Sequence, residues 1–224
     1  MPLSPPVGRQ HLHTRRVTCQ GFYRDDGLFD VEGRITDEKT YEHANEWRGP
    51  LKAGDLVHDM SIRLTLDHRF TIVDVEAATD SSPYRICGDI APNFKKLIGL
   101  RVGPGFTRAV RQRLGGTHGC THLVELLGPV ATTAFQTAGS KKANDLQLAH
   151  RIKIGKPPKP RDPNQPQRKP YMVDNCYAWA SDGEVTKRWV PQFYTGPDAE
   201  AVRAAANGWQ RATDPGRTQR LGRA

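Results

Sequence analysis

The sequence feature that most constrains the fold is a change in the spacing of apolar residues near residue 90. Between residues 14 and 78, apolar side chains recur at every second position in four short segments, whereas after Ile90 they recur three and four positions apart. A period of two places alternate side chains on one face of a β-strand, and the longer period places them along one face of a helix. Strands followed by helices predict an α+β fold, in which helices pack on one face of an antiparallel sheet.

The four alternating segments are predicted to pair as two β-hairpins. The first hairpin covers residues 14–36 and turns at Asp25-Asp26-Gly27, because Asp-Gly tolerates the positive φ that a tight hairpin turn requires. The second hairpin covers residues 57–78 and turns at Asp67-His68. Together they predict a sheet of about four strands with one face packed against the core.

Helical spacing begins after the second hairpin. A first helix is predicted to begin at Ile90-Ala91-Pro92, and a short basic helix is predicted over residues 106–114. The longest helix is predicted over residues 121–137, and Pro129 inside it predicts a kink or a later start. The apolar stripe of this helix comprises Leu123, Leu126, Leu127, Val130, Ala131, Ala134 and Phe135.

An uneven distribution of charge and proline divides the chain into segments. The net charge is +9, and residues 141–224 carry 16 Lys and Arg against eight Asp and Glu. The proline-rich part of residues 141–170 cannot supply the hydrogen bonds of a helix or a central strand, so a basic linker is predicted there. A third hairpin is predicted around Asp182-Gly183, with the option of returning to the sheet. The predicted organisation is an N-terminal extension (1–13), an α+β core domain (14–140), the linker (141–170), a C-terminal hairpin (171–195) and a basic, partly disordered tail (196–224).

The composition argues against several classes of protein. No stretch approaches the roughly 18 consecutive apolar residues of a transmembrane helix, so no membrane association is expected. Residues 1–10 lack the apolar core of a secretory signal, and the four cysteines are too scattered for a disulfide framework. A cytoplasmic protein with reduced thiols is therefore expected. The basic C-terminal segment is typical of attachment to nucleic acid or of a solvated tail, and the absence of aromatic residues between the charges of residues 155–170 favours the tail.

Chemistry is most strongly indicated at His118-Gly119-Cys120-Thr121-His122, which precedes the longest predicted helix. Imidazole and thiolate are ligands suited to zinc and iron. A helix N-terminus favours a thiolate, because unpaired N–H groups and the helix dipole stabilise an anion. Cys120 is therefore the candidate reactive group, with His118 and His122 beside it. Three interpretations stay open: a metal site, a covalent nucleophile or a buried structural cysteine.

Two further residues are expected at the same end of the sheet. Asp80 closes the last strand of the second hairpin, and Cys87 lies just before the next helix. Both are candidate metal ligands beside the His118–His122 segment. The alternatives are that Asp80 is a turn or N-cap residue and that Cys87 packs in the core.

Several sequence blocks resemble a bacterial family known only as a domain of unknown function. The blocks read GLFDVEGRITDEKTY, HDMSIRLTLD, VEAATDSSPY and GCTHLVELLGPVATTAFQ, and the resemblance covers most of residues 3–138. This resemblance implies no activity.

The order of the predicted elements also resembles a second group of proteins. A strand ending in DVEAATD, two helices and then HGC before a long helix are similar to iron–sulfur scaffold and sulfur-transfer proteins of the IscU/SufU type. The resemblance implies that His118 and Cys120 lie near the last ligand position of such a site. It implies that Cys87 or Asp80 lies near the middle one.

Three hypotheses about function follow from these observations. The first is a metal- or sulfur-handling protein related to IscU, holding zinc or iron. The second is an enzyme of a small-molecule pathway that uses Cys120 as nucleophile, activated by His118 or His122. The third is a basic-tailed protein without catalysis, which binds a partner protein or, through its C-terminal segment, nucleic acid.

Overall fold

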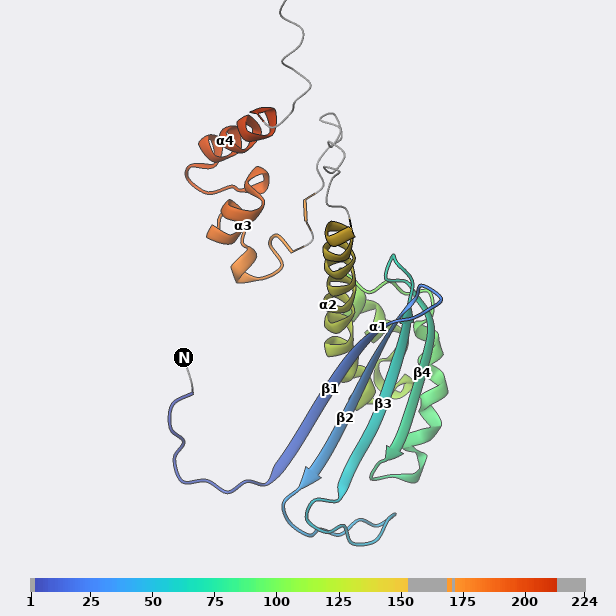
Figure 1. Ribbon diagram of the computed structural model, residues 1–224. Helices are drawn as coiled ribbons and strands as arrows, with labels where there is room; N and C mark the ends of the chain where they lie inside the picture. Colours follow the sequence, from blue (N-terminus) through green and yellow to red (C-terminus); the bar gives the residue numbers. More distant parts are fainter. Residues whose placement is uncertain (1–2, 153–168, 171, 213–224) are drawn as a thin grey trace, which may run out of the picture. The chain divides into compact units, whose positions relative to one another are not determined.

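The computed structural model describes residues 3–152, 169–170 and 172–212, and divides the chain into two compact units at Ile154 and Gly155. The first unit contains the sheet and the helices that cover it (Figure 1). The predicted linker residues 153–168 and tail residues 213–224 lie outside the described residues.

The first unit is built on a four-stranded antiparallel sheet in the order β1-β2-β3-β4, which confirms the predicted α+β fold (Figure 1). Asp26 accepts a hydrogen bond from the N–H of Leu28 in the first turn, where Gly27 has a φ of 87°. In the second turn, the carboxylate of Asp67 accepts hydrogen bonds from the N–H groups of Arg69 and Thr71. The strands are β1 (His13–Tyr23), β2 (Phe29–Lys39), β3 (Leu56–Leu66) and β4 (Ile72–Ser81).

Helices pack against one face of this sheet, as predicted. The first helical segment begins earlier than predicted and is a 3-10 helix, which buries Phe94 and Leu97. The long helix begins at the predicted residue and runs without interruption through Pro129, which is exposed and removes only one backbone donor. It also continues through residues 141–152, which were expected to begin the linker. The helical segments are η1 (Arg85–Leu97), α1 (Phe106–Leu114), η2 (Gly116–His118) and α2 (Thr121–Ile152).

The core lies between the sheet and the apolar stripe of α2. Leu123, Leu126 and Val130 of this stripe are each at most 1% exposed. The helix approaches β2 closely at Gly33, where an added Cβ would lie 2.5 Å from Cγ2 of Val130. A side chain at this position would therefore push the helix away from the sheet.

The second unit is helical where a hairpin was expected. Asp174 has a φ of 65°, which interrupts the predicted strand, and its carboxylate accepts a hydrogen bond from the N–H of Ser181. Gly183 caps the start of a helix, and Glu184 lies in its first turn, where a negative charge is favourable. The expected turn signal Asp182-Gly183 thus marks a helix start. The helical segments are η3 (Tyr177–Trp179), α3 (Glu184–Trp189), η4 (Pro191–Phe193) and α4 (Ala199–Ala212).

Among the described residues, no helix combines the length and the apolar character that a membrane crossing requires.

Candidate metal centre

One end of the inner sheet face carries polar side chains where the alternation would otherwise place apolar ones. Asp37 follows the buried Ile35 by two residues in β2, and His58 precedes the buried Met60 by two residues in β3. The strand register places Asp37 directly opposite His58. His122 reaches the same place from the first turn of α2. Three elements that are far apart in sequence therefore meet at one polar group.

The three side chains offer ligand atoms that all lie within 4.8 Å of one another. Nδ1 of His58 is 3.0 Å from Oδ2 of Asp37, and Nε2 of His122 is 3.9 Å from the same oxygen. The two imidazole rings lie one over the other, with centroids 3.9 Å apart. The Asp37 side chain is 1% exposed, whereas those of His58 and His122 are 15% and 22% exposed. The carboxylate is therefore the most buried of the three side chains, and the imidazoles lie nearer to solvent.

Two residues of β1 hold the carboxylate of Asp37 in place. Arg15 donates from Nε to Oδ1 and from a terminal nitrogen to Oδ2, each at 2.8 Å, and His13 donates from Nε2 to Oδ1 at 2.9 Å. Arg15 also pairs with Glu125 of α2 at 2.9 Å. Burial favours the neutral acid, but the hydrogen bonds from Arg15 and His13 outweigh it and lower the pKa of Asp37 to about 2. Asp37 is thus a fixed anion at neutral pH.

The surroundings of His58 and His122 favour the neutral form of both imidazoles. Burial lowers the pKa of His58 below its ordinary value, and the neighbouring His122 lowers it further. Burial also lowers the pKa of His122, and the positive charge of Arg15 adds to this effect. Neutral imidazole is the form that binds a metal ion.

One polar atom of the group has no hydrogen-bond partner within the described part of the chain. Nδ1 of His58 is buried and lies beside Oδ2 of Asp37, yet the contact lacks hydrogen-bond geometry. Buried polar atoms without a partner are uncommon and costly in native proteins. A cation between these two atoms would satisfy both, so the donor set fits a metal ion.

The other residues predicted from sequence lie apart from this group. Sγ of Cys120 contacts Sδ of Met60 at 3.7 Å, and the side chain packs against the core. His118 is exposed, and its backbone carbonyl accepts a hydrogen bond from the Asn93 amide. Asp80 is exposed in β4, and Cys87 is half-buried in η1. Of the five predicted residues, His122 alone belongs to the group of possible ligand atoms found in the described residues.

Four residues at this site were not among the candidates predicted from sequence: Asp37, His58, His13 and Arg15. The sequence did contain a signal for two of them. Asp37 and His58 occupy inward-facing strand positions, and the other inward-facing positions of these strands are mostly apolar. A charged or polar side chain at a buried, inward-facing position needs a hydrogen-bond partner, an opposite charge or a metal ion. His13 and Arg15 lie on an exposed strand, so only the register with β2 identifies their partner.

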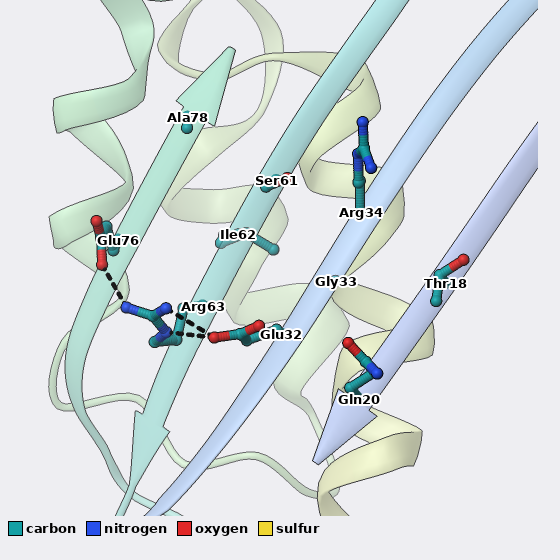
Figure 2. Close-up of a pocket in the computed structure, with 10 residues that line it drawn as sticks. All are labelled: Thr18, Gln20, Glu32, Gly33, Arg34, Ser61, Ile62, Arg63, Glu76 and Ala78. Atoms are coloured by element: carbon teal, nitrogen blue, oxygen red, sulfur yellow. Dashed lines mark hydrogen bonds and ion pairs between the residues drawn. The ribbon is translucent and has the colours of Figure 1, made fainter. Parts of the chain in front are cut away.

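A pocket lies on the sheet face that points away from the helices, and Figure 2 shows its lining. One of its lining residues, Arg63, pairs with Glu32 at 2.7 Å and with Glu76 at 2.7 Å (Figure 2). Arg34 at its edge pairs with Asp59 at 2.6 Å. Each of these charged side chains has a partner of opposite charge, as on an ordinary solvated sheet face.

Comparison with known proteins assigns residues 13–136 to a family model described as "Protein of unknown function (DUF2889)". No curated protein and no solved structure matches the chain. The matched residues contain the whole sheet and every residue of the polar group. The similarity to proteins of the IscU/SufU type stays a prediction.

Proposed function

The chain belongs to this family of unknown function, and we propose that its sheet domain binds a divalent transition metal ion, zinc or ferrous iron, through Asp37, His58 and His122. The observation that carries the proposal is the convergence of the three ligand atoms, one of which, Nδ1 of His58, makes no hydrogen bond to another described residue. Two imidazoles and one carboxylate are a set that both zinc enzymes and non-haem iron enzymes use.

The distances support a metal ion of this size. Zinc bonds of about 2.0–2.2 Å to nitrogen and oxygen separate the ligand atoms of a tetrahedral site by about 3.3–3.6 Å. The separations of 3.0 Å and 3.9 Å from Oδ2 of Asp37 lie on either side of this range. Small rotations of the two imidazole rings would bring all three atoms into place.

The surroundings of Asp37 support the proposal as well. Metal-binding carboxylates are commonly held by hydrogen bonds from residues that do not touch the metal. Arg15 and His13 occupy both positions on Oδ1 and one on Oδ2, which leaves Oδ2 with a free lone pair toward the histidines. Three protein ligands also leave a fourth position for water or a substrate, which is typical of catalytic zinc sites.

The two other hypotheses make different predictions. An enzyme with a Cys120 nucleophile, activated by His118 or His122, requires rapid alkylation of that thiol and no metal. A binding protein without catalysis requires retention on a partner, such as nucleic acid, that falls with salt. The metal proposal requires neither behaviour.

The test is cobalt(II) binding to the purified full-length chain, followed by its visible absorption, with zinc(II) as competitor. Wild type is expected to bind one equivalent, and zinc is expected to displace it. Asp37→Asn and His58→Ala should each lower the affinity by about 10–100-fold or more, since they remove ligands rather than outer partners. His68→Ala is the matched control, because His68 is an exposed histidine in the β3–β4 turn. Equal binding by all four proteins would overturn the proposal.

A further inference from the structure

A second pair of donor atoms lies beside the two histidines and comes from the same two elements. Met60 follows His58 by two residues in β3, and Cys120 precedes His122 by two residues at the start of α2. Sγ of Cys120 lies 3.7 Å from Sδ of Met60. The sequence thus contains His-x-Met on the strand and Cys-x-His at the helix start, and the fold brings the two sulfurs together as it brings the two imidazoles together.

The strand explains why the sulfur pair lies next to the histidine pair. Alternate residues of a strand point to the same face and lie about 6.6 Å apart along it. Met60 is 1% exposed, so its thioether lies on the core side of the histidines. Cys120 is only partly buried, so the pair can be reached from the surface.

The separation of the sulfurs fits one metal ion between them. Two metal–sulfur bonds of about 2.3 Å that span 3.7 Å enclose an angle of about 107° at the metal, close to the tetrahedral angle of about 109°. The two sulfurs, which a hydrogen bond from the thiol now joins, therefore lie at a separation that one metal ion can bridge.

The two kinds of sulfur ligand indicate which metal ion the pair would bind. Thiolate and thioether are soft ligands, and together they favour copper(I) over the harder divalent ions that suit carboxylate. We propose that Cys120 and Met60 bind copper(I). The thiol proton is released to solvent as the copper–sulfur bond forms, and copper keeps its oxidation state.

This site does not depend on the divalent site proposed above, because its two sulfur ligands are different atoms. Asp37→Asn should therefore lose cobalt(II) binding and keep copper(I) binding. Met60→Leu should show the reverse, since leucine conserves the volume of the buried side chain and removes only the thioether.

The test is an anaerobic competition for copper(I) between the full-length protein and the coloured chelator bicinchoninate. Wild type is expected to withdraw one equivalent of copper(I) from the chelator. Met60→Leu and Cys120→Ser should each weaken binding by about tenfold or more, because each loses a ligand. Cys19→Ser is the matched control, since Cys19 is also partly buried and packs against the same core from β1.

Circular dichroism melting of each variant separates loss of a ligand from loss of the fold. A folded Met60→Leu protein that binds copper(I) as tightly as wild type would overturn the proposal. Failure of wild type to compete with bicinchoninate would overturn it equally. Cobalt(II) titration of the same samples reports the divalent site separately, so either proposal can fail alone.

Discussion

At the scale of single residues, Asp37 carries the proposed divalent site. It is an almost fully buried carboxylate whose pKa is lowered to about 2, and Arg15 and His13 donate hydrogen bonds to it. An acid with a depressed pKa stabilises the fold above its unfolded pKa, and that contribution is lost as the pH falls through the folded value. Arg15, His13 and the neighbouring histidines together explain why a carboxylate can occupy the buried strand position of Asp37.

The depressed pKa of Asp37 predicts a specific loss of stability in acid. The shift from 3.8 to about 2 corresponds to about 2.5 kcal/mol, fully present above pH 4 and lost as the pH falls to about 2. Urea unfolding of the metal-free protein at a series of pH values measures this loss. In the Asp37→Asn protein, the loss of unfolding free energy in acid is expected to be smaller by this amount. A parallel pH dependence in the two proteins would contradict the assigned role of Arg15 and His13.

Arg15 is predicted to act as a positioning residue for the metal. Its planar guanidinium binds both oxygens of Asp37, a geometry that lysine cannot reproduce. Arg15→Lys should therefore lower cobalt(II) affinity by about 10–100-fold while the protein stays folded. The neighbouring Arg16→Lys is the control, because Arg16 pairs with Glu38 and not with Asp37. Equal losses in both variants would contradict this role, because both substitutions keep the positive charge and Arg16 pairs with Glu38 instead.

At the scale of elements, α2 contributes both to the core and to the proposed site. Leu123, Leu126 and Val130 hold it on the sheet, and His122 at its start thereby reaches Asp37. The apolar stripe was predictable from sequence, because helical spacing requires only local information. The strands were predictable for the same reason. The positions of Asp37 and His58 were not, because strand register depends on pairing between segments that are distant in sequence.

The packing of α2 predicts a large stability loss for a single substitution. Leu126 is 1% exposed, and Leu→Ala changes in cores cost roughly 2–5 kcal/mol. Leu126→Ala should therefore strongly lower the melting temperature. Thr132→Ala on the exposed side of the same helix should change stability by at most about 0.5 kcal/mol. Similar melting temperatures for the two variants would contradict the packing of this helix face on the sheet.

At the scale of the whole molecule, the two units differ in how well the sequence predicts them. The first unit follows its hydrophobic spacing throughout the sheet and α2. In the second unit, Asp182-Gly183 signals either a hairpin turn or a helix start, and the residues after it determine which one forms. Short segments with few apolar residues carry little periodic information, so local sequence does not separate the two outcomes.

The division into two units predicts that the sheet domain is independent. All residues of the proposed divalent site and of the sulfur pair lie in the first unit, Met1–Ile154. A protein ending at Ile154 should therefore fold, melt cooperatively and bind cobalt(II) as the full chain does. Circular dichroism and metal titration of the two proteins measure this. Loss of the metal site in the shorter protein would show that the second unit contributes to it.

The most direct measurement is the position of the metal itself. Crystals of the full-length protein grown with zinc(II) would give an anomalous difference map at the zinc absorption edge. The predicted result is one strong peak bonded to Oδ2 of Asp37, Nδ1 of His58 and Nε2 of His122, at about 2.0–2.2 Å from each. A well-ordered Asp37 group with no anomalous peak beside it, or a zinc ion bound only elsewhere on the chain, would contradict the proposed metal centre.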